Sequence, residues 1–130
     1  MVPLSPVPVV SIVDDDESVR SAMSSLVRSL GYRVAVFASA EAFLASPWLH
    51  ETRFLILDVQ MPGMSGLDLQ DELRSRKHSV PTIFITAFPE ERGRRRAEAG
   101  GAMGFFGKPV DDEIVIRCLE EALRQSLNRT

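Results

Sequence analysis

Residues 54–69 read FLILDVQMPGMSGLDL and hold the clearest passage from strand to turn to helix in the sequence. The run FLIL at residues 54–57 is apolar at consecutive positions, which is typical of a strand covered on both faces. Asp58 follows this strand, MPGMSG is a turn signal, and Ser65 is a suitable N-terminal cap for a helix. The apolar positions expected on that helix are Leu67, Leu69 and Leu73. The stretch therefore predicts one strand–turn–helix unit of an α/β fold.

The same order of strand and helix recurs along the chain. Short runs rich in β-branched and aromatic residues predict strands at 7–13, 33–37, 54–57, 82–86 and 104–106. Apolar residues at helical spacing predict helices over 19–30, 40–44, 67–73, 90–99 and 114–127. Further start and stop signals are Gly31, Ser39, Pro47 and Asp111. Strands that alternate with helices in this way imply a parallel sheet with helices on both faces.

The fourth expected helix differs from the others. Residues 90–99 read EERGRRRAEA, with Gly93 in the interior and only Ala97 and Ala99 as small apolar anchors. Because two alanines bury little area and an interior glycine costs roughly 1 kcal/mol, we expect this helix to be the least firmly packed. Its arginines are offset by glutamates, so a solvated surface is favoured over a nucleic-acid contact. The glycines between residues 93 and 107 predict raised mobility there.

Length and composition favour one ordinary domain. The chain has 130 residues, with 15 basic and 18 acidic side chains for a net charge of −3, and 45% of its residues are hydrophobic. We expect a folded domain over residues 9–127, tails at 1–8 and 128–130, and no room for a second domain. Apolar runs too short for a membrane span and an N-terminus unlike a signal peptide predict a cytoplasmic location. The single cysteine, Cys118, excludes an internal disulfide and a cysteine-rich metal site.

Polar and charged residues gather at the expected carboxyl ends of the strands. In a parallel sheet these ends meet along one edge, where ligands bind. The residues concerned are Asp14, Asp15, Asp58, Thr86 and Lys108. Three carboxylates in one crevice raise one another's pKa unless a cation lies between them, and their oxygens suit Mg²⁺. With Lys108 as a fixed positive charge, this set predicts a phosphoryl-transfer site in which an aspartate accepts the phosphoryl group.

Each of these residues taken alone has a simpler interpretation. The acidic run at 14–17 also suits a solvated helix start, and Asp58 also suits a turn or a helix cap. Thr86 is a common type of strand residue, and an isolated Lys108 would be typical of a protein surface. The combination at one sheet edge carries the prediction.

Together these residues resemble the receiver domain of response regulators, over nearly the whole chain. The matching motifs are IVDDDESVR, LILDVQMPGMSGLDL, ITAF and FFGKP, with 28 residues from Asp58 to Thr86 and 22 from Thr86 to Lys108. The sequence around ITAFPEE is most similar to that of receivers of the FixJ and NarL type. The resemblance implies a flavodoxin-like (CheY-like) three-layer α/β sandwich, with five helices and a five-stranded parallel sheet of order 2-1-3-4-5.

The resemblance also implies a role for each acidic residue. Asp58 would accept the phosphoryl group. Asp14, Asp15 and Asp58 would bind Mg²⁺, for which Mn²⁺ can substitute, together with the main-chain carbonyl of Gln60. Gln60 and Phe88 are the two departures near the site, and both are expected to affect the lifetime of the phosphoryl group in an undetermined direction.

A second group of residues would respond to phosphorylation. Thr86 and Lys108 would bind phosphoryl oxygens, and the peptide bond between Lys108 and Pro109 is expected to be cis. Phe105 holds the position of the rotating aromatic switch, and the small Ala87 would leave room for its ring. Thr86 would move toward the new oxygens and Phe105 would fill the space left, changing the surface of the fourth helix, fifth strand and fifth helix.

The partners follow from the same resemblance. A sensor histidine kinase would supply the phosphoryl group. The domain would be a signalling domain and not an enzyme, and the only reactions it would catalyse are its own phosphorylation and dephosphorylation. Output through a C-terminal DNA-binding domain outside this sequence is favoured, with a phosphorylation-dependent homodimer as a further expectation. A stand-alone receiver that acts by protein contact remains the alternative. We expect neither nucleic-acid binding by this domain nor a membrane contact.

Two other classes of protein fit less well. Haloacid-dehalogenase phosphohydrolases carry their nucleophile after the first strand and a second aspartate two residues later. Here Asp14 and Asp15 are adjacent, Asp58 follows the third strand, and Gln60 stands two residues beyond it. A dinucleotide-binding module needs glycines after its first strand, where this chain has DDDES.

Overall fold

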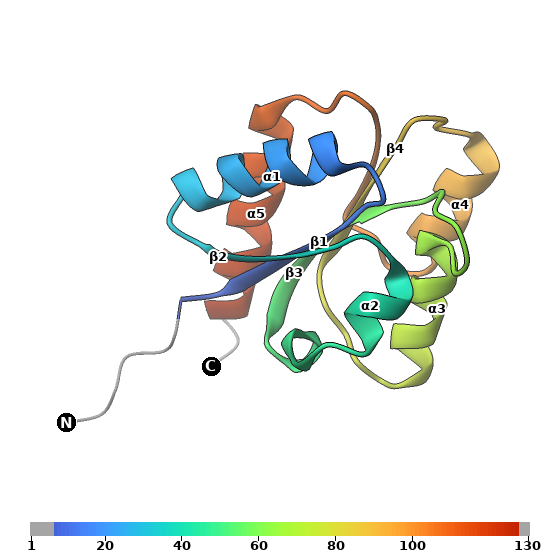
Figure 1. Cartoon of the computed structure of the whole chain (residues 1–130), viewed down its shortest axis with the longest axis horizontal. Helices are drawn as coiled ribbons and strands as arrows, with labels where there is room; N and C mark the ends of the chain where they lie inside the picture. The colour runs from blue at the N-terminus through green and yellow to red at the C-terminus, as the bar shows by residue number, and fades with distance from the viewer. Residues whose placement is uncertain (1–6, 128–130) are drawn as a thin grey trace.

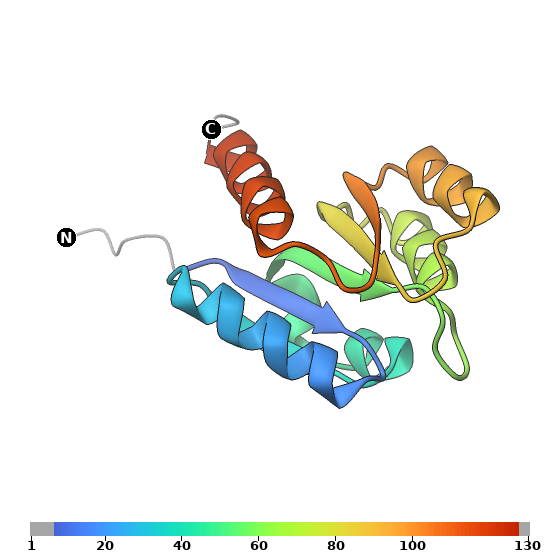
Figure 2. The ribbon, with the colours of Figure 1, turned by 90° about the horizontal axis from the view of Figure 1, so that it is seen from above.

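A computed structural model describes residues 7–127 and shows a parallel sheet between two layers of helices (Figure 1 and Figure 2). The strands are β1 (Val9–Val13), β2 (Arg33–Phe37), β3 (Thr52–Asp58), β4 (Thr82–Thr86) and β5 (Gly104–Gly107). The helices are α1 (Glu17–Ser29), α2 (Ala40–Leu44), α3 (Gly66–Ser75), α4 (Glu91–Ala99) and α5 (Asp112–Leu127), with a 3₁₀ turn, η1 (Pro47–His50). The strand order β2-β1-β3-β4-β5 confirms the expected fold. Of the expected tails, residues 1–6 and 128–130 lie outside the described residues.

The helix signals read from the sequence act where they were expected. Ser39, Ser65 and Asp111 each accept a backbone hydrogen bond from the first turn of α2, α3 and α5, respectively. Gly31 follows α1 with a φ of 94°, a conformation that glycine adopts without strain. These local signals therefore set where the helices begin and end.

Several element boundaries differ from the prediction by a few residues. β1 begins at Val9 rather than at Val7, because Pro8 has no N–H for the ladder and Val7 is 46% exposed. β3 is longer at both ends and β5 runs one residue further. Pro47 opens η1 as well as following α2, and this turn was not predicted.

The core has two parts, one on each face of the sheet. Between the sheet and helices α2, α3 and α4 lie, among others, Phe43, Leu55, Leu57, Leu69 and Phe84. Between the sheet and helices α1 and α5 lie, among others, Ile12, Val27, Ile56, Ile83 and Leu119. Because β1, β3 and β4 contribute to both parts, their residues are buried at every position except Arg53 of β3, as the consecutive apolar runs predict.

Helix α4 is held largely by polar contacts. Ala97 is its one buried residue, and no side chain caps its N-terminus. The Arg96 guanidinium lies 2.9 Å from Asp68 Oδ1 and 2.7 Å from Asp71 Oδ2, both on α3. The arginine-rich face is solvated, as expected, and the greater mobility of this region stays a prediction.

Candidate functional site

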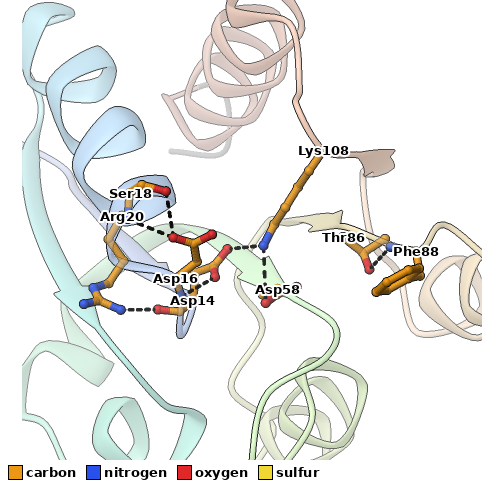
Figure 3. A network of polar contacts seen from close by, with 8 residues as sticks. All are labelled: Asp14, Asp16, Ser18, Arg20, Asp58, Thr86, Phe88 and Lys108. Carbon is orange, nitrogen blue, oxygen red and sulfur yellow. Dashed lines mark hydrogen bonds and ion pairs between the residues drawn. The ribbon is translucent and has the colours of Figure 1, made fainter.

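The strand ends singled out by the sequence meet along one edge of the sheet. Asp14 directly follows β1, Asp58 ends β3, Thr86 ends β4, and Lys108 directly follows β5. Figure 3 shows Asp14, Lys108 and Asp58 pointing toward one another, whereas Thr86 and Phe88 lie apart from them. The structure thus assembles four of the five expected residues, Asp14, Asp15, Asp58 and Lys108, in one cluster and leaves Thr86 beside it.

Lys108 joins the two buried carboxylates. Its Nζ lies 3.0 Å from Asp14 Oδ2 and 3.5 Å from Asp58 Oδ2. Asp14 and Asp58 are only 3% and 4% exposed. A cation between buried acids offsets part of the cost of burying them, so these three side chains form one electrostatic unit.

The protonation of Asp58 reflects this environment. Burial, followed by the nearby charge of Asp14, raises the pKa of Asp58 from 3.8 to about 7, although Lys108 opposes the shift. Burial by itself would lower the pKa of Lys108, but the hydrogen bond to Asp14 and the charge of Asp58 raise it above its usual value. Asp58 therefore titrates near neutral pH while Lys108 stays charged.

The acidic cluster can accommodate a divalent cation. One carboxylate oxygen each from Asp14, Asp15 and Asp58 lie within 4.8 Å of one another. Asp14 and Asp58 are buried, whereas Asp15 is exposed and open to solvent. Hard oxygen ligands on one open side suit Mg²⁺, which keeps several waters or phosphate oxygens in its shell. The raised pKa of Asp58 also supports a cation site, because a bound cation would favour the ionised carboxylate that burial disfavours.

Two neighbours hold Asp14 in place. The backbone N–H of Asp16 donates to Asp14 Oδ1 at 2.9 Å, and Arg20 Nη1 donates to the Asp14 carbonyl at 2.7 Å. Asp16 also caps α1, and its hydrogen bonds with Ser18 lower its pKa. Arg20 was not predicted to be part of the site, because no motif in the sequence marks it.

The loop after Asp58 is fixed by contacts that the sequence did not indicate. A side chain at Gly66 would collide with the Asp58 carbonyl, so glycine lets α3 approach the end of β3. Glu41 Oε2, from α2, accepts a hydrogen bond of 2.9 Å from the backbone N–H of Met64. This bond lowers the pKa of Glu41 and keeps its carboxylate ionised. Gly63, with a φ of 78°, lies against the same carboxylate.

Thr86 is turned toward its own loop. Its side chain is fully buried, and its Oγ1 accepts a hydrogen bond of 3.2 Å from the backbone N–H of Phe88. The Phe88 side chain is 65% exposed, while Ala87 is exposed as well. The threonine hydroxyl is therefore engaged in the turn after β4.

Phe105 already has its ring inside the protein. It is 3% exposed, with its ring centroid 6.1 Å from that of Phe84. A Cβ on Gly93 would lie 3.3 Å from the ring, and the Arg94 guanidinium lies 5.3 Å from the ring centroid. The expected exchange between an outward and an inward ring is thus seen only in its inward form. The Lys108–Pro109 bond is cis, as the resemblance implies, and Gln60 is exposed beside the site.

Comparison with known families agrees with this site. Residues 10–120 match the response regulator receiver domain family. The match covers most of the chain and includes Asp14, Asp58 and Lys108. The chain belongs to this family, and it is the receiver domain of a two-component response regulator.

Individual relatives place it near transcriptional regulators. It is 44% identical over 116 residues to the response regulator protein TmoT of Ectopseudomonas mendocina, covering 89% of this chain and 53% of that protein. It is 36% identical over 113 residues to the transcriptional regulatory protein FixJ of Rhizobium meliloti, covering 87% of this chain and 55% of FixJ. The chain thus spans about half the length of these relatives.

Solved structures agree with the fold. The response regulator StyR superposes with a TM-score of 0.84 at 36% identity, over 95% of this chain and 63% of StyR. The structure titled FixJ-N superposes with a TM-score of 0.79 at 35% identity, over 91% of this chain and 94% of that one. The expected FixJ-like receiver fold is confirmed. None of the helices within the described residues is long and apolar enough to cross a membrane.

Proposed function

We propose that Asp58 is the phosphoacceptor of this receiver and that a sensor histidine kinase is its donor. The observation that carries the proposal is the buried contact of Asp58 with Lys108, which also joins Asp14. A nucleophilic carboxylate beside a fixed ammonium group is the arrangement that transfer of an anionic phosphoryl group requires.

In the proposed step, a carboxylate oxygen of Asp58 attacks the phosphorus of a phosphohistidine. The new O–P bond forms as the P–N bond breaks, and the imidazole leaves. Lys108 Nζ, already beside Asp58, then pairs with phosphoryl oxygens. Asp14, Asp15, Asp58 and the Gln60 carbonyl would hold Mg²⁺, which neutralises the charge that builds up when phosphoryl group and carboxylate meet. The chain catalyses no other reaction in this proposal.

Phosphorylation would then change the loop after β4. Thr86 Oγ1 leaves the Phe88 N–H and donates its own hydrogen to a phosphoryl oxygen, because the added group has a charge of roughly −2. Since Phe105 is already buried, phosphorylation would stabilise the inward ring rather than create it. The surface formed by α4, β5 and α5 would carry the signal, since α4 follows this loop and contains one buried residue.

The output would be transcriptional control. Relatives that extend well beyond the matched region include proteins named as transcriptional regulators, which supports a DNA-binding domain outside this sequence. A homodimer formed through the α4–β5–α5 surface would be the active form. A stand-alone receiver that binds another protein is the alternative.

Acetyl phosphate with Mg²⁺ tests the phosphoacceptor directly. Intact-mass spectrometry should show one added phosphoryl group on the native chain and none on Asp58→Asn. Asp112→Asn, an exposed aspartate in the first turn of α5, is the matched control and should be labelled normally. Labelling of Asp58→Asn at the native rate would refute the proposal. Size-exclusion chromatography with beryllofluoride tests the dimer.

A further inference from the structure

Phe88 and Phe105 differ sharply in exposure. Phe105 is 3% exposed although Thr86 Oγ1 still accepts its hydrogen bond from the Phe88 N–H (Figure 3). The inward position of the Phe105 ring therefore does not depend on a movement of Thr86. Phe88, at 65%, is the most exposed large apolar side chain among the described residues. A conformational change that buries apolar surface thus has more to gain at Phe88 than at Phe105.

Contacts on two sides keep the Phe105 ring inside. Gly93 of α4 has no side chain, and a Cβ at this position would lie 3.3 Å from the ring, so glycine lets the ring lie close to the helix. The Arg94 guanidinium lies 5.3 Å from the ring centroid, within the range of a cation–π contact. On the sheet side, the ring centroid of Phe84 is 6.1 Å away. None of these contacts involves the Thr86 hydroxyl.

A hollow of about 190 Å³ lies beside Phe105, below the first turns of α4. Val59, Leu67 and Phe105 are apolar residues of its wall, and Gly93 also lines it. An apolar cavity of about 150 Å³ accepts a benzene molecule, so the hollow has room for one phenyl ring. Of the two phenylalanines that border it, Phe105 is already buried and Phe88 is not.

The segment that carries Phe88 is held at two points. At one, the Phe88 N–H donates to Thr86 Oγ1 at 3.2 Å. At the other, Pro89 lies against the end of β5, because a Cβ on Gly107 would come within 3.2 Å of the proline ring. Proline also fixes its own φ. Ala87 and Phe88 are exposed between these points, so loss of the bond to Thr86 would release the Phe88 backbone.

We propose that Phe88 is the aromatic residue that moves in this receiver, and that its ring enters the hollow beside Phe105. The inference rests on the proposed function, in which Thr86 Oγ1 turns to a phosphoryl oxygen. The Phe88 N–H then loses its acceptor, the backbone rotates at Phe88, and the ring packs on Phe105. Burial of the ring stabilises this arrangement. The start of α4 moves with it, because Glu90 and Arg92 border the same hollow.

Fluorine NMR of the chain labelled with 4-fluorophenylalanine tests the proposal. The chain has seven phenylalanines, and Phe88→Leu and Phe105→Leu assign the two signals that matter. Changing the solvent from H₂O to D₂O shifts the signal of a ring that meets solvent, so the shift should be large for Phe88 and small for Phe105. In a chain that intact-mass spectrometry shows to be phosphorylated, the Phe88 solvent shift should fall about twofold or more, as the buried form exceeds half of the population. An unchanged Phe88 solvent shift in that chain would overturn the proposal.

A double variant tests the inference without a phosphoryl group. Thr86→Val keeps the branched shape of the side chain but removes the acceptor of the Phe88 N–H. In Asp58→Asn/Thr86→Val, the Phe88 solvent shift should be about half or less of its value in Asp58→Asn alone. Persistent exposure of Phe88 in the double variant would overturn the inference, whichever residue accepts the phosphoryl group. Burial of Phe88 there, with no labelling of Asp58 in the native chain, would refute the phosphoacceptor and support the inference.

Gly93→Val tests where the ring goes. The added side chain occupies the hollow, so Phe88 should keep its large solvent shift in the phosphorylated variant. Glu98→Val is the matched control, because Glu98 is exposed on the same helix and is not among the residues that line the hollow. Its Phe88 solvent shift should fall as in the native chain. Gly93→Ala, the milder change, should give an intermediate value, and full burial of Phe88 in both Gly93 variants would overturn the assigned place.

Discussion

Replacing Asp58 with Asn should stabilise the folded domain in a pH-dependent way. The pKa of Asp58 is about 7 in the folded protein against 3.8 for a free side chain, because burial and Asp14 disfavour its charge. A raised carboxyl pKa means that the folded state binds the proton more tightly. Its favourable contribution is therefore fully present below about pH 4 and is lost as pH rises toward 7.

The size of the effect follows from the same two values. The difference between 3.8 and about 7 corresponds to ~4 kcal/mol at most, since each pKa unit is worth about 1.36 kcal/mol. Part of this shift belongs to the interactions of Asp58 with Asp14 and Lys108, so ~4 kcal/mol is an upper limit although Asp58 is only 4% exposed. Asn is uncharged at every pH, so the variant avoids this loss. We expect a stability gain of about 2–4 kcal/mol at pH 8 and almost none at pH 4, or roughly 10 °C in melting temperature at pH 8.

Urea unfolding of both chains from pH 4 to pH 8, in EDTA, measures the gap. Asp112→Asn is the control and should change stability by less than about 0.5 kcal/mol throughout, because that side chain is exposed. Adding Mg²⁺ should then stabilise the native chain more than Asp58→Asn, since ligand binding to the folded state adds to stability. A constant gap across the pH range, or a less stable Asn variant at pH 8, would refute the electrostatic reasoning.

Three further outcomes follow from the same contacts. Lys108→Met should raise the pKa of Asp58 further and move the pH at which acetyl phosphate labels the chain upward; an unshifted profile would argue against the ion pair. Gly66→Ala should cost more than about 2 kcal/mol in urea unfolding, because the new methyl meets the Asp58 carbonyl, and a neutral result would contradict that packing. Arg96→Ala should speed hydrogen exchange in α4 while costing no more than about 1 kcal/mol of stability, since the partners of Arg96 are exposed. Because Arg96 lowers the pKa of Asp68, the difference in exchange between the native chain and this variant should disappear as the pH falls through the titration of Asp68. Equal exchange at neutral pH would show that the pairs do not hold the helix.

Much of the fold is readable from local sequence. The apolar run before Asp58 predicts a buried strand, and Ser65 predicts the start of α3, because both signals act within a few residues. Boundaries were less certain where two signals competed. Val7 looks like a strand residue, but Pro8 beside it cannot join the ladder, so β1 starts later.

The sequence predicted which side chains form the site, but it did not predict which neighbouring groups hold them in place. Asp14, Asp58 and Lys108 stand out because parallel strand ends meet at one edge. Arg20 and Glu41 have no comparable signal, since what each does depends on backbone groups of the site that the folded chain brings within reach. Their roles appear only once α1 and α2 are placed beside the strand ends.

By itself, the sequence determined the alternation of strands and helices and the chemistry at the strand ends. Hydrophobic periodicity, helix caps and turns are local properties, so they can be recognised in the sequence without knowledge of the fold. Only the tertiary structure decided that Thr86 bonds to Phe88, that the Phe105 ring is already inside, and that Phe88 and Phe105 border one hollow. These facts depend on rotamers and burial, which residues distant in sequence impose together when the chain packs.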